Sequence, residues 1–162
     1  MGIKPKFWFY RNYWWLLIIL FVLACLGLFH FSNNLDITLI ATLTGTFLSL
    51  VFFIQKQRVE EIRLFREIFT ECNARYDKMN DGLNAIVAGC EDNPLSPAER
   101  NLLYDYFNLC GEEYLYYIQG FIFPSVWKAW LNGMKFFIKN KRIAEVWKEE
   151  EKTDSYYGLR IS

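Results

Sequence analysis

The sequence predicts an all-α fold, with a two-helix transmembrane hairpin over residues 1–54 and a cytoplasmic helical bundle over residues 55–162. Of the 162 residues, 53% are hydrophobic and 19% are aromatic, which is well above the soluble average. Two long uncharged runs stand near the N-terminus, and the remainder spaces its apolar residues as helices do. The chain therefore combines a membrane part with a soluble part large enough for a modest core.

The first uncharged run, Tyr13 to Phe31, is long enough to cross a hydrocarbon core of about 30 Å. The second, Ile37 to Ile54, follows a short loop whose last residue, Asp36, can cap the next helix. A cleaved signal peptide is the alternative for the first run, because basic residues precede it. Its length, its Trp14 and Trp15 at an interfacial position and the second run directly after it favour a transmembrane helix.

Charge sets the expected orientation of the two spans. Basic residues flank the outer ends of both runs, whereas the loop that joins them has no lysine or arginine. The flanking residues are Lys4, Lys6 and Arg11 before the first run and Lys56, Arg58, Arg63 and Arg66 after the second. Both termini are therefore expected on the cytoplasmic side.

The second run is expected to continue as a long helix, because beyond Ile54 no glycine or proline interrupts the chain before Gly82. Apolar residues in this region alternate spacings of three and four, as in a bundle or a coiled coil. This seam consists of Ile62, Phe65, Phe69, Cys72, Tyr76, Met79, Leu83 and Ile86. It is expected to form the core of the cytoplasmic domain, with a subunit zipper as the alternative, and Arg75 and Lys78 lie off it.

Three further helices complete the predicted bundle. A capping box at Ser96 and Glu99 starts a helix that Gly120 stops. A second helix over Pro124–Asn140 places its apolar residues along one face, and a short one runs from about Lys141 to Glu151. The tail TDSYYGLRIS is expected to be an ordered end or a docking segment.

The residue inventory argues against catalysis and against a metal centre. The four cysteines form no CxxC pair, and His30, the only histidine, is expected at the opposite membrane face from the cytoplasmic domain. Glu112 and Glu113 can in principle serve acid–base chemistry, but neighbours on a helix point in different directions, so one should be solvated or salt-bridged. P-loop and dinucleotide motifs are absent, and a net charge of zero gives no field for long nucleic acid.

Recognition of a small anionic ligand fits the residues better. Cations for phosphate groups come from Arg75, Lys78, Lys128, Lys135, Lys139, Lys141 and Arg142. Asparagine amides can bind a base edge or a ribose, and Tyr76 or a tryptophan can stack on a base. The candidate ligand-binding residues are Asn73, Arg75, Tyr76, Lys78, Asn80, Trp127, Lys128 and Lys135. The alternative is that these residues form solvated faces and core aromatics.

Several strings along the chain carry a family resemblance. The two spans, LFREIFTECNARYDKMN, LLYDYFNLCGEEYLYYIQGFI, VWKAWLNGMK and the terminal SYYGL are similar to a group of small bacterial two-span membrane proteins. One branch of that group serves type III CRISPR systems as an ancillary effector. The resemblance implies a tetramer in the inner membrane whose cytoplasmic domain binds cyclic tetra-adenylate and then perturbs the bilayer. The resemblance does not identify which residues of this sequence contact the ligand.

Two hypotheses of different class follow for the polar residues at 73–80. In the first, they line an oligomer-axis pocket for a cyclic oligonucleotide. In the second, they form a buried polar network with Asp105, Glu112 or Glu113 that fixes helix register in a membrane-anchored structural or scaffolding protein without a nucleotide ligand. The direction of the Arg75 side chain, toward a carboxylate or toward a solvent-filled axis, separates the two.

Overall fold

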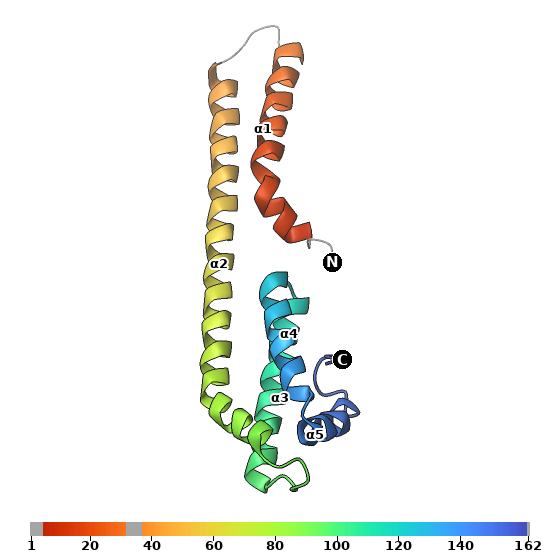
Figure 1. Ribbon diagram of the computed structural model, residues 1–162. Helices are drawn as coiled ribbons and strands as arrows, with labels where there is room; N and C mark the ends of the chain where they lie inside the picture. The colour runs from red at the N-terminus through yellow and green to blue at the C-terminus, as the bar shows by residue number, and fades with distance from the viewer. Residues whose placement is uncertain (1–4, 32–36, 162) are drawn as a thin grey trace. The chain divides into compact units, whose positions relative to one another are not determined.

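The computed structural model describes residues 5–31 and 37–161, which form five α-helices and contain no strand (Figure 1). The helices are α1 (Pro5–Phe31), α2 (Ile37–Ala88), α3 (Pro97–Ile118), α4 (Pro124–Ile138) and α5 (Lys141–Glu151). The prediction of an all-α fold is thus confirmed. The chain divides into two compact units, Met1–Arg63 and Leu64–Ser162, and the division lies within α2.

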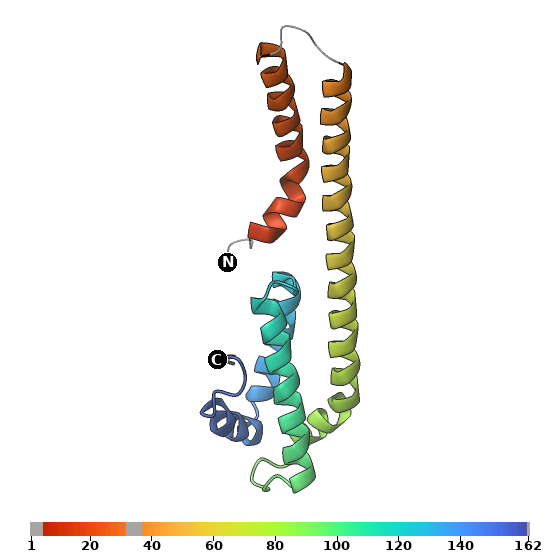
Figure 2. The same ribbon diagram turned by 180° about the vertical axis from the view of Figure 1, so that it is seen from behind.

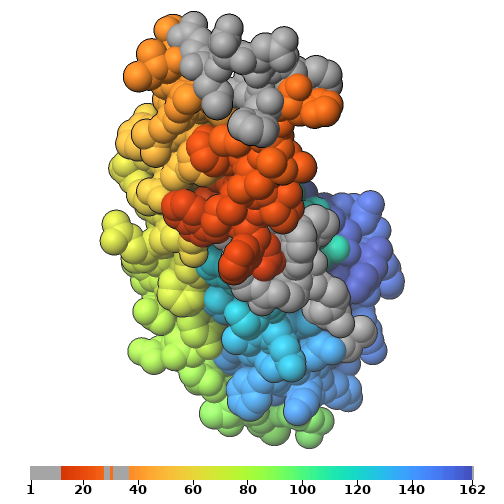
Figure 3. Space-filling view, turned by 90° about the horizontal axis from the view of Figure 1, so that it is seen from above, coloured from red at the N-terminus to blue at the C-terminus, as the bar shows by residue number. Residues whose placement is uncertain are grey.

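The first unit contains α1 and the N-terminal part of α2, which lie side by side in both ribbon views (Figures 1 and 2). The rings of Phe21 and Phe47 join the two helices, with centroids 4.5 Å apart. Most other apolar side chains of this unit are exposed, with Trp15 and Phe52 each 70% exposed. Figure 3 shows the surface that the described residues of this unit form, in red to yellow. So large an apolar surface is unfavourable in water and compatible with lipid.

The predicted transmembrane hairpin requires a correction. Within the described residues one helix, α2, is long and apolar enough to cross a membrane, and no residue in its apolar window is buried. The described apolar stretch of α1, Asn12–Gly27, is shorter than the roughly 20 residues of a typical transmembrane helix. The described residues therefore contain one helix whose apolar segment is of transmembrane length, and a shorter apolar stretch in α1. Asp36, the predicted cap of the second span, lies outside the described residues.

Hydroxyl side chains in the apolar part of α2 are satisfied within the helix. Thr42, Thr44, Thr46 and Ser49 each donate a hydrogen bond to the carbonyl oxygen four residues earlier, at 2.8 to 2.9 Å. Such bonds remove the cost of placing a hydroxyl group in hydrocarbon. These hydroxyl groups are therefore compatible with a lipid environment around this part of α2.

Beyond its apolar part, α2 continues without interruption through Gly82 to Ala88 and bends near its C-terminal end (Figures 1 and 2). A methyl group at Gly82 would lie 2.5 Å from Cδ2 of Leu102, so the glycine allows α3 to approach α2 closely. The helix therefore extends over the whole predicted seam, because a glycine is tolerated where a neighbouring helix packs against it.

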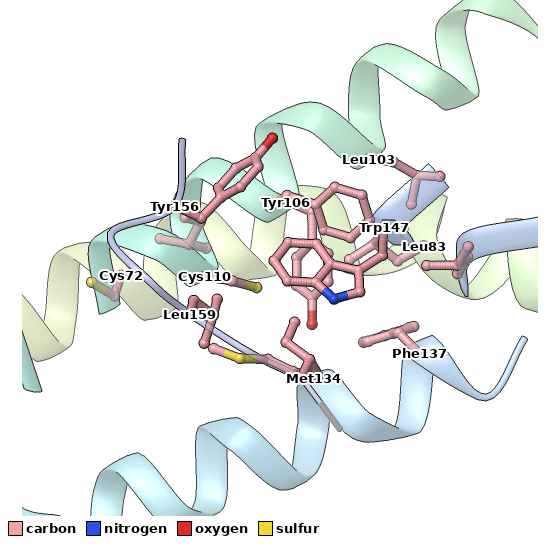
Figure 4. Packing of buried hydrophobic residues seen from close by; sticks show 14 of the residues in the cluster. Cys72, Leu83, Leu103, Tyr106, Cys110, Met134, Phe137, Trp147, Tyr156 and Leu159 are labelled. Atoms are coloured by element: carbon pink, nitrogen blue, oxygen red, sulfur yellow. The ribbon is translucent and has the colours of Figure 1, made fainter. Parts of the chain in front are cut away.

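The second unit packs α3, α4, α5 and the C-terminal tail against the end of α2. Figure 4 shows Cys110, Met134, Trp147 and Leu159 converging from α3, α4, α5 and the tail, and each is at most 2% exposed. Aromatic side chains pack against one another in this core. For example, the ring centroids of Phe107 and Trp147 lie 5.0 Å apart. The tail is therefore an ordered part of the core. This confirms the first of the two alternatives predicted for it, an ordered end or a docking segment.

The predicted seam of α2 is correct only in its C-terminal half. Cys72, Leu83 and Ile86 are buried, and Phe65, Tyr76 and Met79 are partly buried against the core. Ile62 is 51% exposed, and Ile68, which the seam did not include, is buried instead of Phe69. The seam fails toward its N-terminal end because Ile62 falls within the first unit, outside this core.

Local signals at the helix ends are confirmed. The Ser96 hydroxyl accepts from the Glu99 amide, and the Glu99 carboxylate accepts from the Ser96 amide, which completes the capping box of α3. Gly120, with φ of 86°, follows the end of α3 in the left-handed conformation that glycine favours. The helices α4 and α5 begin at the residues that the sequence predicted.

Candidate functional site

Arg75 points at a carboxylate. Its Nη2 donates to Oε1 of Glu112 at 3.1 Å and its Nη1 donates to Oε2, which makes a two-pronged pair between α2 and α3. The hydrogen bond from Arg75 to Glu112 raises the pKa of the guanidinium. Both side chains are 36% exposed, so solvent weakens the pair and its contribution to stability is modest. Three guanidinium N–H donors remain for another acceptor.

Other predicted residues of α2 contact one another. The Tyr76 hydroxyl donates to Oδ1 of Asn80 at 3.0 Å, and Nδ2 of Asn84 donates to the same oxygen at 3.0 Å. The Tyr76 ring also lies 6.5 Å from the rings of Tyr106 and Phe137, and burial raises the pKa of its hydroxyl. Tyr76 and Asn80 therefore serve the packing of α2, whereas half-buried Asn73 joins no such network.

The predicted residues of α4 are divided between core and surface. Trp127 is 5% exposed and stacks on Tyr117, with ring centroids 5.0 Å apart and planes at 12°. Lys128 and Lys135 are exposed and form no ion pair with the described part of the chain. Trp127 is thus occupied by core contacts, while the two lysines remain open to solvent.

A cavity of about 460 Å³ lies between α2, α3 and the C-terminal tail. The side chains that carry chemistry there are Arg75, Lys78, Asp105, Asn108, Glu112 and Tyr157. Lys78 and Asp105 are exposed and form no ion pair with any described residue. Of the eight predicted ligand-binding residues, the cavity brings together Arg75 and Lys78. Sequence reasoning missed Asn108 and Tyr157, although the paired tyrosines of SYYGL were a signal.

A second cavity, of about 380 Å³, lies beside α5 and the connector between α2 and α3. Its acidic residues outnumber its basic residues, which does not favour an anionic ligand. The acidic residues are Glu91, Asp92, Glu145 and Glu149, and the basic residues are Arg100, Lys141 and Arg142. Arg142, predicted as a cation for phosphate groups, is 7% exposed and bonded within the fold, so that prediction is wrong for this residue.

The two neighbouring glutamates of α3 have opposite environments. Glu112 is salt-bridged to Arg75, as expected for one of the pair, whereas Glu113 is 6% exposed. Burial raises the pKa of Glu113 to about 8, and the positive charge of Arg75 opposes this shift in part. The Glu113 side chain is therefore largely protonated at neutral pH.

Two buried thiols lie near Glu113. Burial raises the pKa of the Cys72 thiol to about 12 and that of the Cys110 thiol well above its usual range, and the Glu113 carboxylate adds to both shifts. The thiolate is the reactive form of cysteine, so these thiols are poor nucleophiles. Across residues 5–31 and 37–161, no three His, Cys, Asp or Glu side chains are placed to hold a metal ion.

No protein family, no curated protein and no solved structure matches this chain. Its function is therefore argued from the arrangement of its own residues.

Proposed function

We propose that this protein is a membrane-anchored effector of antiviral defence that binds a cyclic oligoadenylate messenger, cyclic tetra-adenylate, and then perturbs the bilayer. The observation that carries the proposal is the continuity of α2. This single helix of 52 residues contains the apolar segment of transmembrane length and also Arg75 and Lys78, which line the cavity. Ligand binding at one part of the helix can thus act on the other.

The membrane part of the proposal rests on the exposed apolar segment of α2. Basic residues at 56–66 follow that segment, which favours a cytoplasmic location for the second unit in a bacterial inner membrane. The contact between Phe21 and Phe47 keeps α1 beside α2.

The ligand part of the proposal rests on the cavity. Lys78 and the unused donors of Arg75 suit phosphate oxygens, while Asp105 and Asn108 offer an acceptor and an amide to the edge of an adenine base. A cyclic ligand with four equivalent phosphates matches a symmetric oligomer in which each subunit offers one such group. A homotetramer is therefore the assembly that the proposal requires.

A specific observation favours a second candidate, a membrane-anchored structural or scaffolding protein. Arg75 is paired with Glu112, and Tyr76 is bonded to Asn80, so much of the polar specificity of α2 is already used within the chain. In that case Lys78 and Asp105 are ordinary solvated residues.

Isothermal titration of the full chain in detergent micelles with cyclic tetra-adenylate separates the two candidates. Lys78→Ala is expected to weaken binding by roughly 1.5 to 3 kcal/mol, the range for a hydrogen bond to a charged group. Lys78 is a cleaner choice than Arg75, because Arg75→Ala also breaks the pair with Glu112. Lys148→Ala, an exposed lysine of α5, is the matched control and should leave the affinity unchanged. If the intact oligomer gives no binding heat, the structural candidate replaces the effector.

A further inference from the structure

A tight turn in the C-terminal tail places Tyr157 in an unusual backbone conformation. The amide of Leu159 donates to the carbonyl oxygen of Tyr156 at 2.9 Å, and the two residues between them have φ of 54° (Tyr157) and 81° (Gly158). Two central residues with positive φ and this hydrogen bond define a type I′ turn, for which Asn-Gly is the favoured pair. Tyrosine in the first central position is disfavoured, because its Cβ crowds the backbone.

The surrounding structure holds this turn in place. Tyr156 is 6% exposed, and its hydroxyl donates to Oε2 of Glu150 at 2.7 Å. Its ring packs on Gly111 of α3, where a methyl group would lie 3.2 Å from the ring. Leu159, on the other side of the turn, is 1% exposed. Anchors on both sides therefore enforce a conformation that Tyr157 itself does not favour.

Core packing does not explain why a tyrosine occupies this position. The Tyr157 side chain is 54% exposed and lines the cavity together with Lys78 and Asn108. Strained residues that the surrounding fold enforces are concentrated at ligand clamps and active sites, where the strained residue has a function. An exposed aromatic ring beside a cation and an amide is also the arrangement that binds a base and its phosphate.

We infer that Tyr157 is a stacking residue that binds an adenine base of the ligand in the cavity between α2, α3 and the tail. This inference rests on the proposed function and assigns a binding role to the tail. The phenol ring covers one face of the base, Lys78 and Arg75 bind the adjoining phosphate, and Asp105 accepts from the exocyclic amine.

Two substitutions separate the ring from the turn. Tyr157→Asn removes the ring but supplies the residue that the turn prefers, so the melting temperature of the full chain in detergent should stay equal or rise. Its affinity for cyclic tetra-adenylate in isothermal titration should fall roughly tenfold or more, the scale of one base stacked on an aromatic ring. Tyr157→Phe keeps the ring and should bind within roughly threefold of the unsubstituted protein.

Phe136→Asn is the matched control, because Phe136 is also 54% exposed but does not line the cavity. Its affinity should equal that of the unsubstituted protein. If Tyr157→Asn binds as tightly as the unsubstituted protein, or if Tyr157→Phe loses as much affinity as Tyr157→Asn, the stacking role is overturned while the proposed function stands. If the unsubstituted protein does not bind the messenger, both the inference and the proposed function fail.

Discussion

Arg142→Ala is expected to lower the free energy of unfolding by roughly 2 to 4 kcal/mol. Arg142 is 7% exposed, and its Nη1 donates to the carbonyl oxygen of Ile86 at 3.3 Å. Its Nη2 donates to Oε1 of Glu99 at 3.2 Å. Removal of the side chain leaves a cavity and takes a donor from a carbonyl group at the C-terminal end of α2.

The position of Arg142 explains the size of this effect. Glu99 accepts from Arg142 through Oε1 and from the Ser96 amide through Oε2, at 2.7 Å, so one carboxylate serves both the capping box of α3 and the buried arginine. Arg142 lies in the first turn of α5 and thereby joins the ends of three helices. A methyl group at Gly89 would lie 2.8 Å from Nη1 of Arg142, so the connector after α2 fits closely around the guanidinium group.

Denaturant unfolding of the full chain in detergent, followed by tryptophan fluorescence, measures the effect. Arg100→Ala is the control, because Arg100 forms an exposed ion pair with Glu149 at 4.0 Å, which should contribute at most about 1 kcal/mol. Arg142→Lys should remain well below the unsubstituted protein, since an ammonium group cannot reproduce the forked contacts of a guanidinium. Equal losses for Arg142→Ala and Arg100→Ala would show that the buried contacts of Arg142 do not stabilise the fold.

Glu113→Gln is expected to change how stability depends on pH. The pKa of Glu113 is raised from 4.5 to about 8 in the fold, so the folded state binds more protons than the unfolded state between those values. The contribution of this group is fully present below about pH 4.5 and is lost as pH rises through about 8. Its loss between about pH 5 and about pH 8 should be roughly 2 to 4 kcal/mol.

The test compares free energies of unfolding of Glu113→Gln and the unsubstituted protein across this pH range. Glutamine keeps the size of the side chain and cannot ionise. The free energy of unfolding of the variant, relative to that of the unsubstituted protein, should therefore increase as pH rises. Glu145→Gln, at an exposed position of α5 that does not contribute to the shift at Glu113, should keep the pH dependence of the unsubstituted protein. A constant difference between Glu113→Gln and the unsubstituted protein at all pH values would show that Glu113 is ionised in the fold.

The elements that the sequence predicted well are those with local signals. The capping box at Ser96 and Glu99 and the start of α5 at Lys141 follow from neighbouring residues alone. The membrane hairpin and the N-terminal end of the seam were predicted less well, because hydropathy and spacing do not show where a core ends. Ile62 has the same spacing as Ile86, yet the first is exposed and the second is buried.

In the candidate site, too, some residues have a local sequence signal and others depend on the fold. Arg75 and Lys78 were identifiable because they lie on a helix, off its apolar positions. For Tyr157 the sequence offers only the paired tyrosines of SYYGL, because its left-handed backbone results from anchors on both sides of the turn that become visible only in the fold. Arg142 shows the opposite error: a cation in the sequence indicates a phosphate site or a buried structural contact equally well, and burial decides between them.

We propose that α2 couples ligand binding to the membrane. A Gly-Gly-Ser insertion between Gln55 and Arg58 interrupts the helix between its apolar segment and the second unit, because glycine disfavours helical continuity. The measurement is membrane potential in cells that produce cyclic tetra-adenylate, with ligand binding by the purified chain as the control. We expect the insertion variant to bind the messenger as the unsubstituted protein does but to leave the membrane polarised. Undiminished depolarisation by the insertion variant would contradict this coupling.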